Sequence, residues 1–353
     1  MTKKERLNSP STRYQGSKRR MLPWLRSIFE TLKFETALDG FGGSGSVSYL
    51  LKTMGKEVTF NDILKSNYQT GIALIENSDT ALTEDDINLM FNTNQNEGSG
   101  VISKVYKDIY FLDDENLILD NIIRNIESLS SLYRGRTLRY KKALAYHILF
   151  QSCLSKRPFN LFHRKNLNLR TNDVKRTFGN KITWDKSFEE HFRKFNEEYA
   201  NFTLDNKKQN KAINKDIFHV ENEFDLVYLD PPYTRKHSNT PQNYGEMYNF
   251  LEGIMNYDKW TDKIDSSRVH KPFICCQNQW NHDLTKNFDM LFKKFANSII
   301  VVSYGNKGKP SVDTIVKIMK KYKKSVTTKS QPYSYKLNRN NGIGYREVLI
   351  IGK

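Results

Sequence analysis

The chain has 353 residues, enough to bury a large core in one large domain or two. Its 56 lysines and arginines against 39 aspartates and glutamates give a formal charge of +17, which suggests a polyanionic partner: a nucleic acid or an anionic surface. No run of about 18 apolar residues is present, so no membrane span is expected. The chain starts without the apolar core of a signal peptide, and its three cysteines show neither metal-type spacing nor a disulfide framework. We therefore expect a reduced, cytoplasmic protein without a metal site.

A basic loop precedes the first expected helix. Residues Arg13 to Arg20 combine a glycine with several cations and lead into the amphipathic stretch Met21 to Leu32. A short loop with a glycine and a cation at the start of a helix is a plausible anion site. A solvated basic face is the alternative interpretation of the same residues.

A glycine-rich turn follows. The stretch Thr36 to Ser48 predicts a strand, a tight turn and a helix, and its glycines let the backbone approach a ligand closely. The stretch Glu57 to Asp62 predicts a second strand that ends in a carboxylate. An acidic residue at this position typically binds the ribose hydroxyls of a nucleoside cofactor. Taken alone, this pattern fits dinucleotide-binding proteins equally.

Between residues 67 and 210 the pattern becomes helical, with helices expected at Ile87–Phe91, Leu117–Leu132 and Leu138–Leu154. So long a segment is too large for a loop, which indicates a mostly helical inserted subdomain. Its end interleaves cations with Phe, Asn and His, a composition typical of contacts with the phosphates and bases of nucleic acid. A solvated cationic face is the alternative. The candidate DNA-contacting residues are Lys156, Arg157, Asn160, Arg164 and Asn166.

The stretch Phe224 to Leu229 predicts a buried parallel strand, with Asp230 at the carboxyl end where open α/β sheets bind their ligands. Pro231 and Pro232 lack backbone donors, so the neighbouring carbonyls are rigidly aimed. The Asp230 carboxylate and the Pro231 carbonyl could accept both hydrogens of an exocyclic aromatic amine and localise its lone pair. Tyr233 could stack on the base. The alternative interpretation is a strand that ends in an acidic, proline-containing turn without a catalytic role.

The rest of the chain predicts further elements of the sheet domain. A helix is expected at Tyr244–Asn256, a strand at Ser298–Tyr304 and a helix at Val312–Met319. Two final strands, Ser334–Leu337 and Tyr345–Ile351, are separated by a turn and predict an antiparallel hairpin at the sheet edge.

The sequence Asp-Pro-Pro-Tyr after an apolar strand resembles the catalytic motif of N6-adenine DNA methyltransferases. The basic loop, the glycine turn, the central insertion and this motif follow the order of the Dam-like α group, and the resemblance covers nearly the whole chain. It implies a Rossmann-like sheet with a C-terminal antiparallel hairpin, built from residues 1–66 and 211–353. It also implies an inserted target-recognition subdomain over residues 67–210.

The resemblance assigns residues to S-adenosylmethionine (AdoMet), the implied cofactor, and to the target base. Lys18 lies near the methionine carboxylate in this scheme, and Asp216 takes the adenine amino group of AdoMet. The implied cofactor residues are Tyr14, Lys18, Asp39, Phe41, Gly43, Gly45, Asp62, Asp216 and Ile217. The implied catalytic residues are Asp230, Pro231, Pro232 and Tyr233.

The implied activity is site-specific methylation of a flipped-out adenine in double-stranded DNA. Phe159 to Asn166 resembles the segment that precedes the DNA-reading loops of the family. Such enzymes commonly accompany a restriction endonuclease, so a cognate endonuclease encoded nearby is an expected partner.

Three other functions are compatible with parts of the sequence. Adenine in RNA would satisfy the same pocket, although the long basic insertion and the chain order favour DNA. A catalytically inactive nucleic-acid-binding module would not need the intact Asp-Pro-Pro-Tyr stretch. A nucleotide-dependent oxidoreductase leaves both that stretch and the positive charge unexplained. Cytosine C5 methylation is disfavoured because no cysteine lies in a Pro-Cys context.

Overall fold

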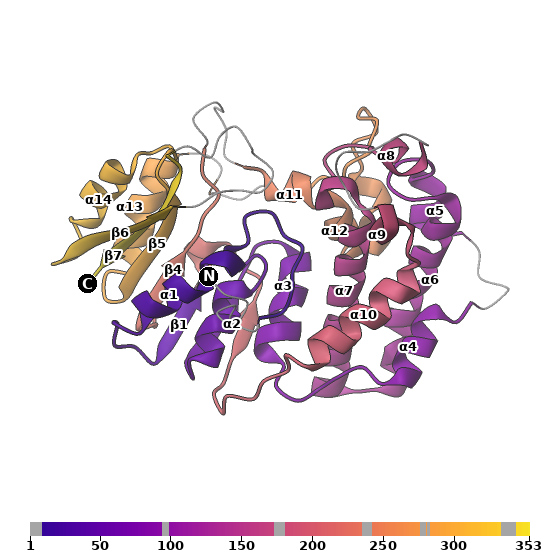
Figure 1. Ribbon diagram of the computed structural model, residues 1–353, viewed down its shortest axis with the longest axis horizontal. Coiled ribbons are helices and arrows are strands. Elements are labelled where there is room, and N and C mark those ends of the chain that lie inside the picture. The colour runs from indigo at the N-terminus through magenta and orange to yellow at the C-terminus, as the bar shows by residue number, and fades with distance from the viewer. Residues whose placement is uncertain are drawn as a thin grey trace.

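A computed structural model describes residues 9–93, 99–172, 181–234, 242–275, 280, 283–332 and 344–353. In this part of the chain a seven-stranded sheet is flanked by helices, and a layer of further helices lies beside the β3 edge (Figure 1). The strands are β1 Thr36–Asp39, β2 Glu57–Asn61, β3 Lys211–Ile213, β4 Leu226–Leu229, β5 Ile299–Gly305, β6 Val326–Pro332 and β7 Arg346–Gly352.

The strand order is β3-β2-β1-β4-β5-β7-β6. The first five strands in this order run parallel, whereas β7 is antiparallel to both β5 and β6. This mostly parallel sheet confirms the predicted α/β class. The predicted strand Ser334–Leu337 lies outside the described residues. β3 ends at Ile213, three residues before Asp216, and Ile217–His219 forms a 3-10 turn, η5.

Helices occupy most of the remaining described residues. Beside the sheet lie η2 Lys18–Met21, α1 Leu22–Phe29, α2 Ser46–Thr53, α3 Lys65–Gly71, η3 Ile72–Glu76, α13 Leu284–Lys294 and α14 Val312–Met319. The helical layer contains α4 Glu84–Phe91, α5 Val101–Val105, α6 Asp113–Leu132, α7 Gly135–Lys156, η4 Pro158–Asn160, α8 Asn168–Thr171, α9 Lys181–Asp185, α10 Phe188–Ala200, α11 Tyr244–Met247, α12 Asn249–Ile254, η6 Tyr257–Lys259 and η7 Thr261–Lys263. None of the described helices is both long and apolar enough to cross a membrane.

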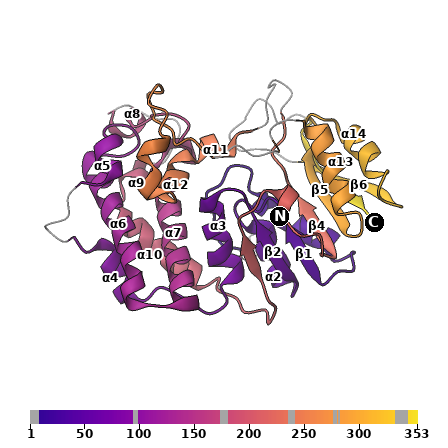
Figure 2. The ribbon, with the colours of Figure 1, turned by 180° about the vertical axis from the view of Figure 1, so that it is seen from behind.

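Side chains alternate between the two faces of the sheet because successive strand residues point to opposite sides. In β4, Leu226 and Tyr228 join one buried cluster, whereas Val227 and Leu229 join another. The second cluster is completed by α13 and α14, which lie beside β5 and β6 in the view from behind (Figure 2). The first cluster contains residues of α1 and α2 and continues into the helical layer.

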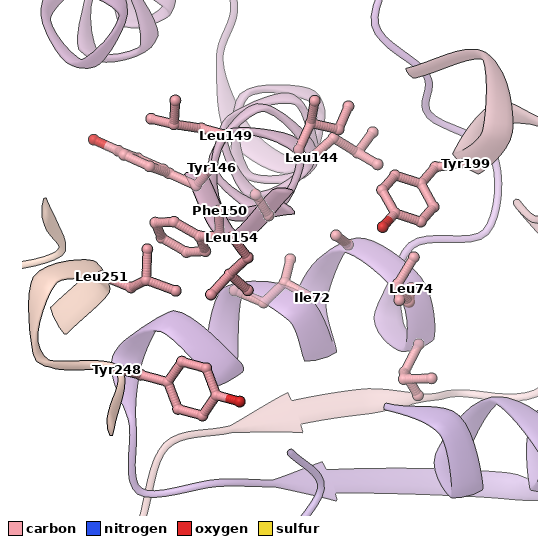
Figure 3. Packing of buried hydrophobic residues seen from close by; sticks show 14 of the residues in the cluster. Ile72, Leu74, Leu144, Tyr146, Leu149, Phe150, Leu154, Tyr199, Tyr248 and Leu251 are labelled. Atoms are coloured by element: carbon pink, nitrogen blue, oxygen red, sulfur yellow. The ribbon is translucent and has the colours of Figure 1, made fainter. Parts of the chain in front are cut away.

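Helix α7 is the centre of that helical layer. Nearly all its side chains from Tyr140 onward are buried. Figure 3 shows Phe150 and Leu154 of α7 close to Ile72 of η3 and Leu251 of α12. Because these residues share one cluster with strand residues of the sheet, the two parts have a continuous core.

The segment after β4 packs with the helical layer. The ring of Phe250 on α12 lies 4.9–5.4 Å, between ring centroids, from four aromatic rings, those of Tyr106, Tyr110, Phe162 and Trp260. The backbone N–H of Phe162 donates to the carbonyl of Met247 at 2.9 Å. Residues 244–263 therefore lie with the helices, although the sequence grouped them with the sheet.

A buried carboxylate joins this segment to the sheet side. Glu252 is 5% exposed, and its two oxygens accept hydrogen bonds from the backbone N–H groups of Ser66 at 2.7 Å and Lys65 at 3.1 Å. These N–H groups belong to the first turn of α3, which has no partners for them within the helix. A carboxylate at a helix N-terminus also interacts favourably with the helix dipole. Glu252 thus fixes the start of α3 just after Asp62.

Replacing Glu252 with alanine should lower the free energy of unfolding by about 1–3 kcal/mol, because two buried N–H groups lose their partners. Urea denaturation measures this difference. Glu197 is an exposed helical glutamate on α10, and its replacement with alanine is the matched control, expected to change stability by less than about 0.5 kcal/mol. Equal stabilities of the two variants would contradict the capping role.

Candidate active site

A cavity lies at the carboxyl ends of β1, β2 and β4, and its empty volume is about 960 Å³ including the part open to solvent. Parallel strands end at the same edge of a sheet, so the residues after each strand meet there. Ten of the predicted site residues line the cavity: Tyr14, Lys18, Asp39, Phe41, Gly43, Asp62, Asp216, Ile217, Asp230 and Pro232. Gly45, Pro231 and Tyr233 are not part of the lining.

The glycine turn after β1 forms one wall. A Cβ at Gly42 would collide with the ring of Phe60, so only glycine fits there. Gly43 has a φ of +49°, a left-handed conformation that favours glycine. Its N–H donates to Asp62 Oδ2 at 2.9 Å. Gly45 has a φ of +71° and precedes α2, so its role in the turn is conformational.

Asp62 organises this wall. Its Oδ1 accepts the N–H of Leu64 at 2.9 Å, and its Oδ2 accepts Asn67 Nδ2 at 3.1 Å as well as the Gly43 N–H. Burial raises the pKa of Asp62 to about 6, and these hydrogen bonds oppose the rise. The predicted ribose contact stays a prediction, while the observed hydrogen bonds give Asp62 a second role, which is to hold the glycine turn.

Three tyrosines stack together, and two of them, Tyr14 and Tyr244, line the cavity. The rings of Tyr14 and Tyr248 are 4.8 Å apart between centroids and nearly parallel, and those of Tyr14 and Tyr244 are 5.6 Å apart. The Tyr14 hydroxyl accepts Asn67 Nδ2 at 3.2 Å. The stack connects the basic N-terminal loop to α11 and α12, which sequence patterns did not predict.

Asp39 lies at the end of β1 and is 1% exposed. Its Oδ2 accepts the Ser48 hydroxyl at 2.6 Å, whereas its Oδ1 has no hydrogen-bond partner among the described residues. Burial raises the pKa of Asp39 to about 7, and the carboxylates of Asp230 and Asp62 contribute to the rise. A buried acceptor that lines a cavity and lacks a partner is suited to a ligand's polar group.

Asp230 lies just after β4, with its side chain 20% exposed. Its two oxygens lie 2.7 and 2.8 Å from the ammonium of Lys18, which is 6% exposed. Burial raises the pKa of Asp230 to about 6; Lys18 opposes this rise, and Glu347 adds to it. The contact of Lys18 with a cofactor carboxylate stays a prediction, because the observed partners of its ammonium are protein carboxylates.

A hydrogen bond from Trp280 holds the backbone that follows Asp230. Trp280 lines the cavity, and its Nε1 donates to the Pro232 carbonyl at 2.7 Å. Its ring also meets Phe41 edge-on at 5.1 Å between centroids. Tyr233 packs its ring 4.7 Å from that of Tyr304, and its hydroxyl is 2.6 Å from that of Tyr345. Stacking of Tyr233 on a base therefore stays a prediction.

Lys156 and Arg157 are 1% and 0% exposed, so the structure contradicts their predicted contacts with DNA phosphates. Lys156 Nζ lies 2.8 Å from Glu115 Oε1. The Arg157 guanidinium donates to the backbone carbonyls of Tyr110, Leu161, Arg164 and Lys165 at 2.6–3.3 Å. Sequence alone does not distinguish these two buried cations from the exposed Arg164 and Lys165 a few residues later.

The loop that Arg157 holds carries the other predicted contacts. Asn160 and Asn166 have φ values of +55° and +50°, and Phe159 has +64°. Such left-handed residues need support from their surroundings, which the buried guanidinium supplies. Arg164 is exposed and Asn160 and Asn166 are half-buried, so all three remain available as candidate contacts.

Sequence reasoning missed Glu347, Trp280, Tyr244 and Tyr248. Glu347 lies near Lys18 but more than 300 residues away in the chain, and Trp280 stands in a polar stretch without a recognisable pattern. The strand prediction for Tyr345–Ile351 placed Glu347 on the sheet without showing which face of the site it would meet.

Comparisons with known proteins show which family the chain resembles. The sequence profile of the D12 class N6 adenine-specific DNA methyltransferases matches residues 14–304. The chain is similar to the Type II methyltransferase M2.HphI of Haemophilus parahaemolyticus, with 30% identity over 358 residues, covering 97% of each chain. It is also similar to the modification methylase StsI of Streptococcus sanguinis, with 26% identity over 363 residues, covering 93% of this chain and 49% of that relative.

The match to the family profile includes the glycine turn, the helical insertion and the Asp-Pro-Pro-Tyr motif. Type II enzymes of this family use AdoMet as the methyl donor. The chain belongs to the D12 class N6 adenine-specific DNA methyltransferases.

Proposed function

We propose that the chain methylates the N6 amino group of a flipped-out adenine at specific sites in duplex DNA. The observation that carries this proposal is the position of Asp230, which lies in the same cavity as the glycine turn, Asp39 and Asp62. A methyl donor and an aromatic amine can therefore meet within one enclosure. The cost of unstacking the base is a few kcal/mol, which the protein offsets with contacts to the base and the DNA backbone.

The residues of the cavity fit AdoMet. Asp39 Oδ1 is a buried acceptor without a partner among the described residues, which suits a cationic or hydroxyl group. Asp62 and Asp216 are acceptors for the ribose hydroxyls and the adenine amine, and Ile217 offers an apolar surface to the adenine ring. When bound, AdoMet supplies an electrophilic methyl group.

Asp230 and the backbone beside it activate the amine. The lone pair of an exocyclic amine is delocalised into its ring, so the nitrogen is a poor nucleophile. Acceptance of both N–H hydrogens, by the Asp230 carboxylate and the Pro231 carbonyl, localises that pair. Trp280 holds the Pro232 carbonyl at 2.7 Å and so keeps this backbone in one conformation. Acceptors fixed in advance need no reorganisation during methyl transfer.

The DNA-facing surface is the loop over residues 158–166. Figures 1 and 2 place α8, which follows this loop, at the same end of the molecule as α11. The hydrogen bond from the Phe162 N–H to the Met247 carbonyl ties the loop to α11, and Tyr244 and Gly245 of α11 line the cavity. Duplex DNA on this loop would therefore lie close to Asp230.

The target-recognition subdomain comprises residues 67–210 together with 244–263, because α12 packs inside the helical layer. Residues 1–66, 211–234 and 283–353 form the AdoMet-binding catalytic domain. A cognate restriction endonuclease encoded nearby is the expected partner, since the relative M2.HphI is a Type II methyltransferase.

The defining experiment is methylation of plasmid DNA by the purified protein with AdoMet, followed by sequencing that detects modified bases. N6-methyladenine at one recurring sequence is the expected result. Transcripts of the same plasmid test the RNA alternative, and methylation of RNA alone would contradict the proposal.

Replacing Asp230 with alanine should abolish methyl transfer while AdoMet still binds, because Asp230 serves the amine. Asparagine should retain some activity, since its amide oxygen still accepts one hydrogen bond. Incorporation of tritiated methyl groups measures turnover, and Asp85→Ala, at an exposed position on α4, is the control. Turnover near normal in Asp230→Ala would contradict this assignment.

Replacing Asp62 with alanine should weaken AdoMet binding by about 1–3 kcal/mol, the usual cost of leaving buried polar groups unpaired. The Gly43 N–H loses its acceptor in this variant, so the turn loosens as well. Calorimetric titration without DNA isolates the effect, again with Asp85→Ala as the control. Unchanged AdoMet affinity with weaker DNA binding would mean that Asp62 belongs to the DNA side.

Replacing both Arg164 and Lys165 with alanine should flatten the salt dependence of DNA binding. Each phosphate contact contributes a slope of about −0.9 in the log–log plot for duplex DNA, so the slope should change by up to about 1.8. Fluorescence anisotropy over a salt series measures it, with Lys194→Ala on α10 as a matched exposed control. Identical slopes in the double variant and the wild type would move the DNA contacts elsewhere.

A further inference from the structure

A second carboxylate lies beside the ammonium that binds Asp230. Glu347, at the start of β7, is 0% exposed, and its Oε1 lies 3.4 Å from Lys18 Nζ. The same oxygen accepts the hydroxyl of Ser303 at 2.7 Å, from the adjacent strand β5. Glu347 Oε2 has no hydrogen-bond partner among the described residues. Lys18 Nζ therefore lies within 3.4 Å of two carboxylates that come from different strands of the sheet.

The buried arrangement of Lys18 with two carboxylates costs stability. A role in the reaction would explain why it is present. Lys18 and Asp230 alone would be a neutral pair, whereas the addition of Glu347 leaves a net negative charge in a buried place. A buried carboxylate is unfavourable without full pairing, and one oxygen of Glu347 has no partner among the described residues. Hydrogen bonding to Ser303 alone would be satisfied by an amide.

The second carboxylate can be explained by the requirement that Asp230 accept a hydrogen bond from the target amine. Lys18 Nζ lies 2.7–2.8 Å from both oxygens of Asp230, the group that must accept an N–H of the adenine amine. While the ammonium contacts both oxygens, it offsets the negative charge that attracts the amine hydrogen, so its withdrawal from one oxygen strengthens that oxygen as an acceptor. Lysine has a flexible stem and a compact charge, so a small movement of Nζ exchanges one carboxylate for the other.

We propose that Glu347 is a positioning residue that takes over the Lys18 ammonium when Asp230 binds the target amine. This inference rests on the proposed function of Asp230. The exchange keeps the ammonium paired throughout, so a buried charge is never left alone. Glu347 touches neither the base nor the methyl donor in this role and acts only through Lys18.

Substitution of Glu347 by glutamine separates this role from a structural one. Glutamine keeps the size of the side chain and can accept the Ser303 hydroxyl, but it removes the charge that attracts Lys18. The ammonium should then stay on Asp230. Lys18, Asp39, Tyr228 and Glu347 are the charged or titratable neighbours that act on Asp230 or are acted on by it. Among them, only Glu347 changes in this variant.

The experiment is single-turnover methyl transfer against pH, with AdoMet and cognate DNA saturating. In the wild type, activity should rise as pH increases through the pKa of Asp230, about 6, because the carboxylate is the active form. In Glu347→Gln the plateau rate should fall roughly 10- to 100-fold, as for a misplaced catalytic group. Its acid limb should move to lower pH, because Glu347 raises the pKa of Asp230.

A measurement without turnover gives a second readout. Carbon-13 NMR of the aspartate carboxyls in the cofactor-free protein, with Asp230→Asn to assign the signal, should show Asp230 titrating at lower pH in Glu347→Gln. Glu252→Gln is the matched control, since it is also a buried glutamate but pairs with backbone N–H groups. In Glu252→Gln, the NMR titration of Asp230 and the acid limb of the rate profile should coincide with those of the wild type.

A plateau and acid limb identical to the wild type would overturn the proposal, and so would a lower plateau with an unmoved limb. If Glu347→Gln does not fold, Glu347→Asp carries the test, since a carboxylate withdrawn by one methylene should lower the plateau and shift the limb in the same direction. A wild-type protein inactive on all DNA contradicts the proposed function itself. If the wild type is active and the Glu347 variants have the same plateau rate and acid limb, only the role of Glu347 is contradicted.

Discussion

The constraint on which the site depends is electrostatic: Asp39, Asp62 and Asp230 end three neighbouring parallel strands and so share one cavity. Burial raises the pKa of each, and the charges of Asp62 and Asp230 raise that of Asp39 further. Each carboxylate is stabilised differently. Asp62 is stabilised by backbone and amide donors, Asp39 by one hydroxyl, and Asp230 by an ammonium. The folded backbone therefore gives three similar carboxylates different partners within one cavity.

The helical layer and the sheet share one hydrophobic core. Helix α7 has few exposed residues because it packs against the sheet side as well as against its own layer. The aromatic stack of Tyr14 and Tyr248 and the cap formed by Glu252 add contacts across the boundary. The proposed DNA loop and the proposed cofactor cavity are thus joined by packed side chains.

Local patterns in the sequence predicted β1, β2, β4, β5 and β7, and the motifs that follow β1, β2 and β4, whereas they did not predict β6. The glycine turn, Asp62 and Asp230 could be read because each follows an apolar strand, and parallel strands bring their ends together. Burial of isolated cations could not be read: Lys156 and Arg157 look like Arg164 in the sequence, and only the packing of α6, α7 and the loop separates them. Glu347 and Trp280 were missed for a related reason, since both reach the site through long-range contacts.

The buried guanidinium of Arg157 has a consequence for how new sequence preferences could arise. It binds the main chain of the loop and leaves the outward-facing side chains out of the framework. The path of the loop is therefore independent of the residues at its exposed positions, such as Arg164. In the proposed DNA-binding role of the loop, exchange of those residues between relatives, or in a designed library, would alter the base contacts while the path of the loop is kept. The exposed side chains of the loop can therefore vary while Arg157 keeps its backbone path unchanged.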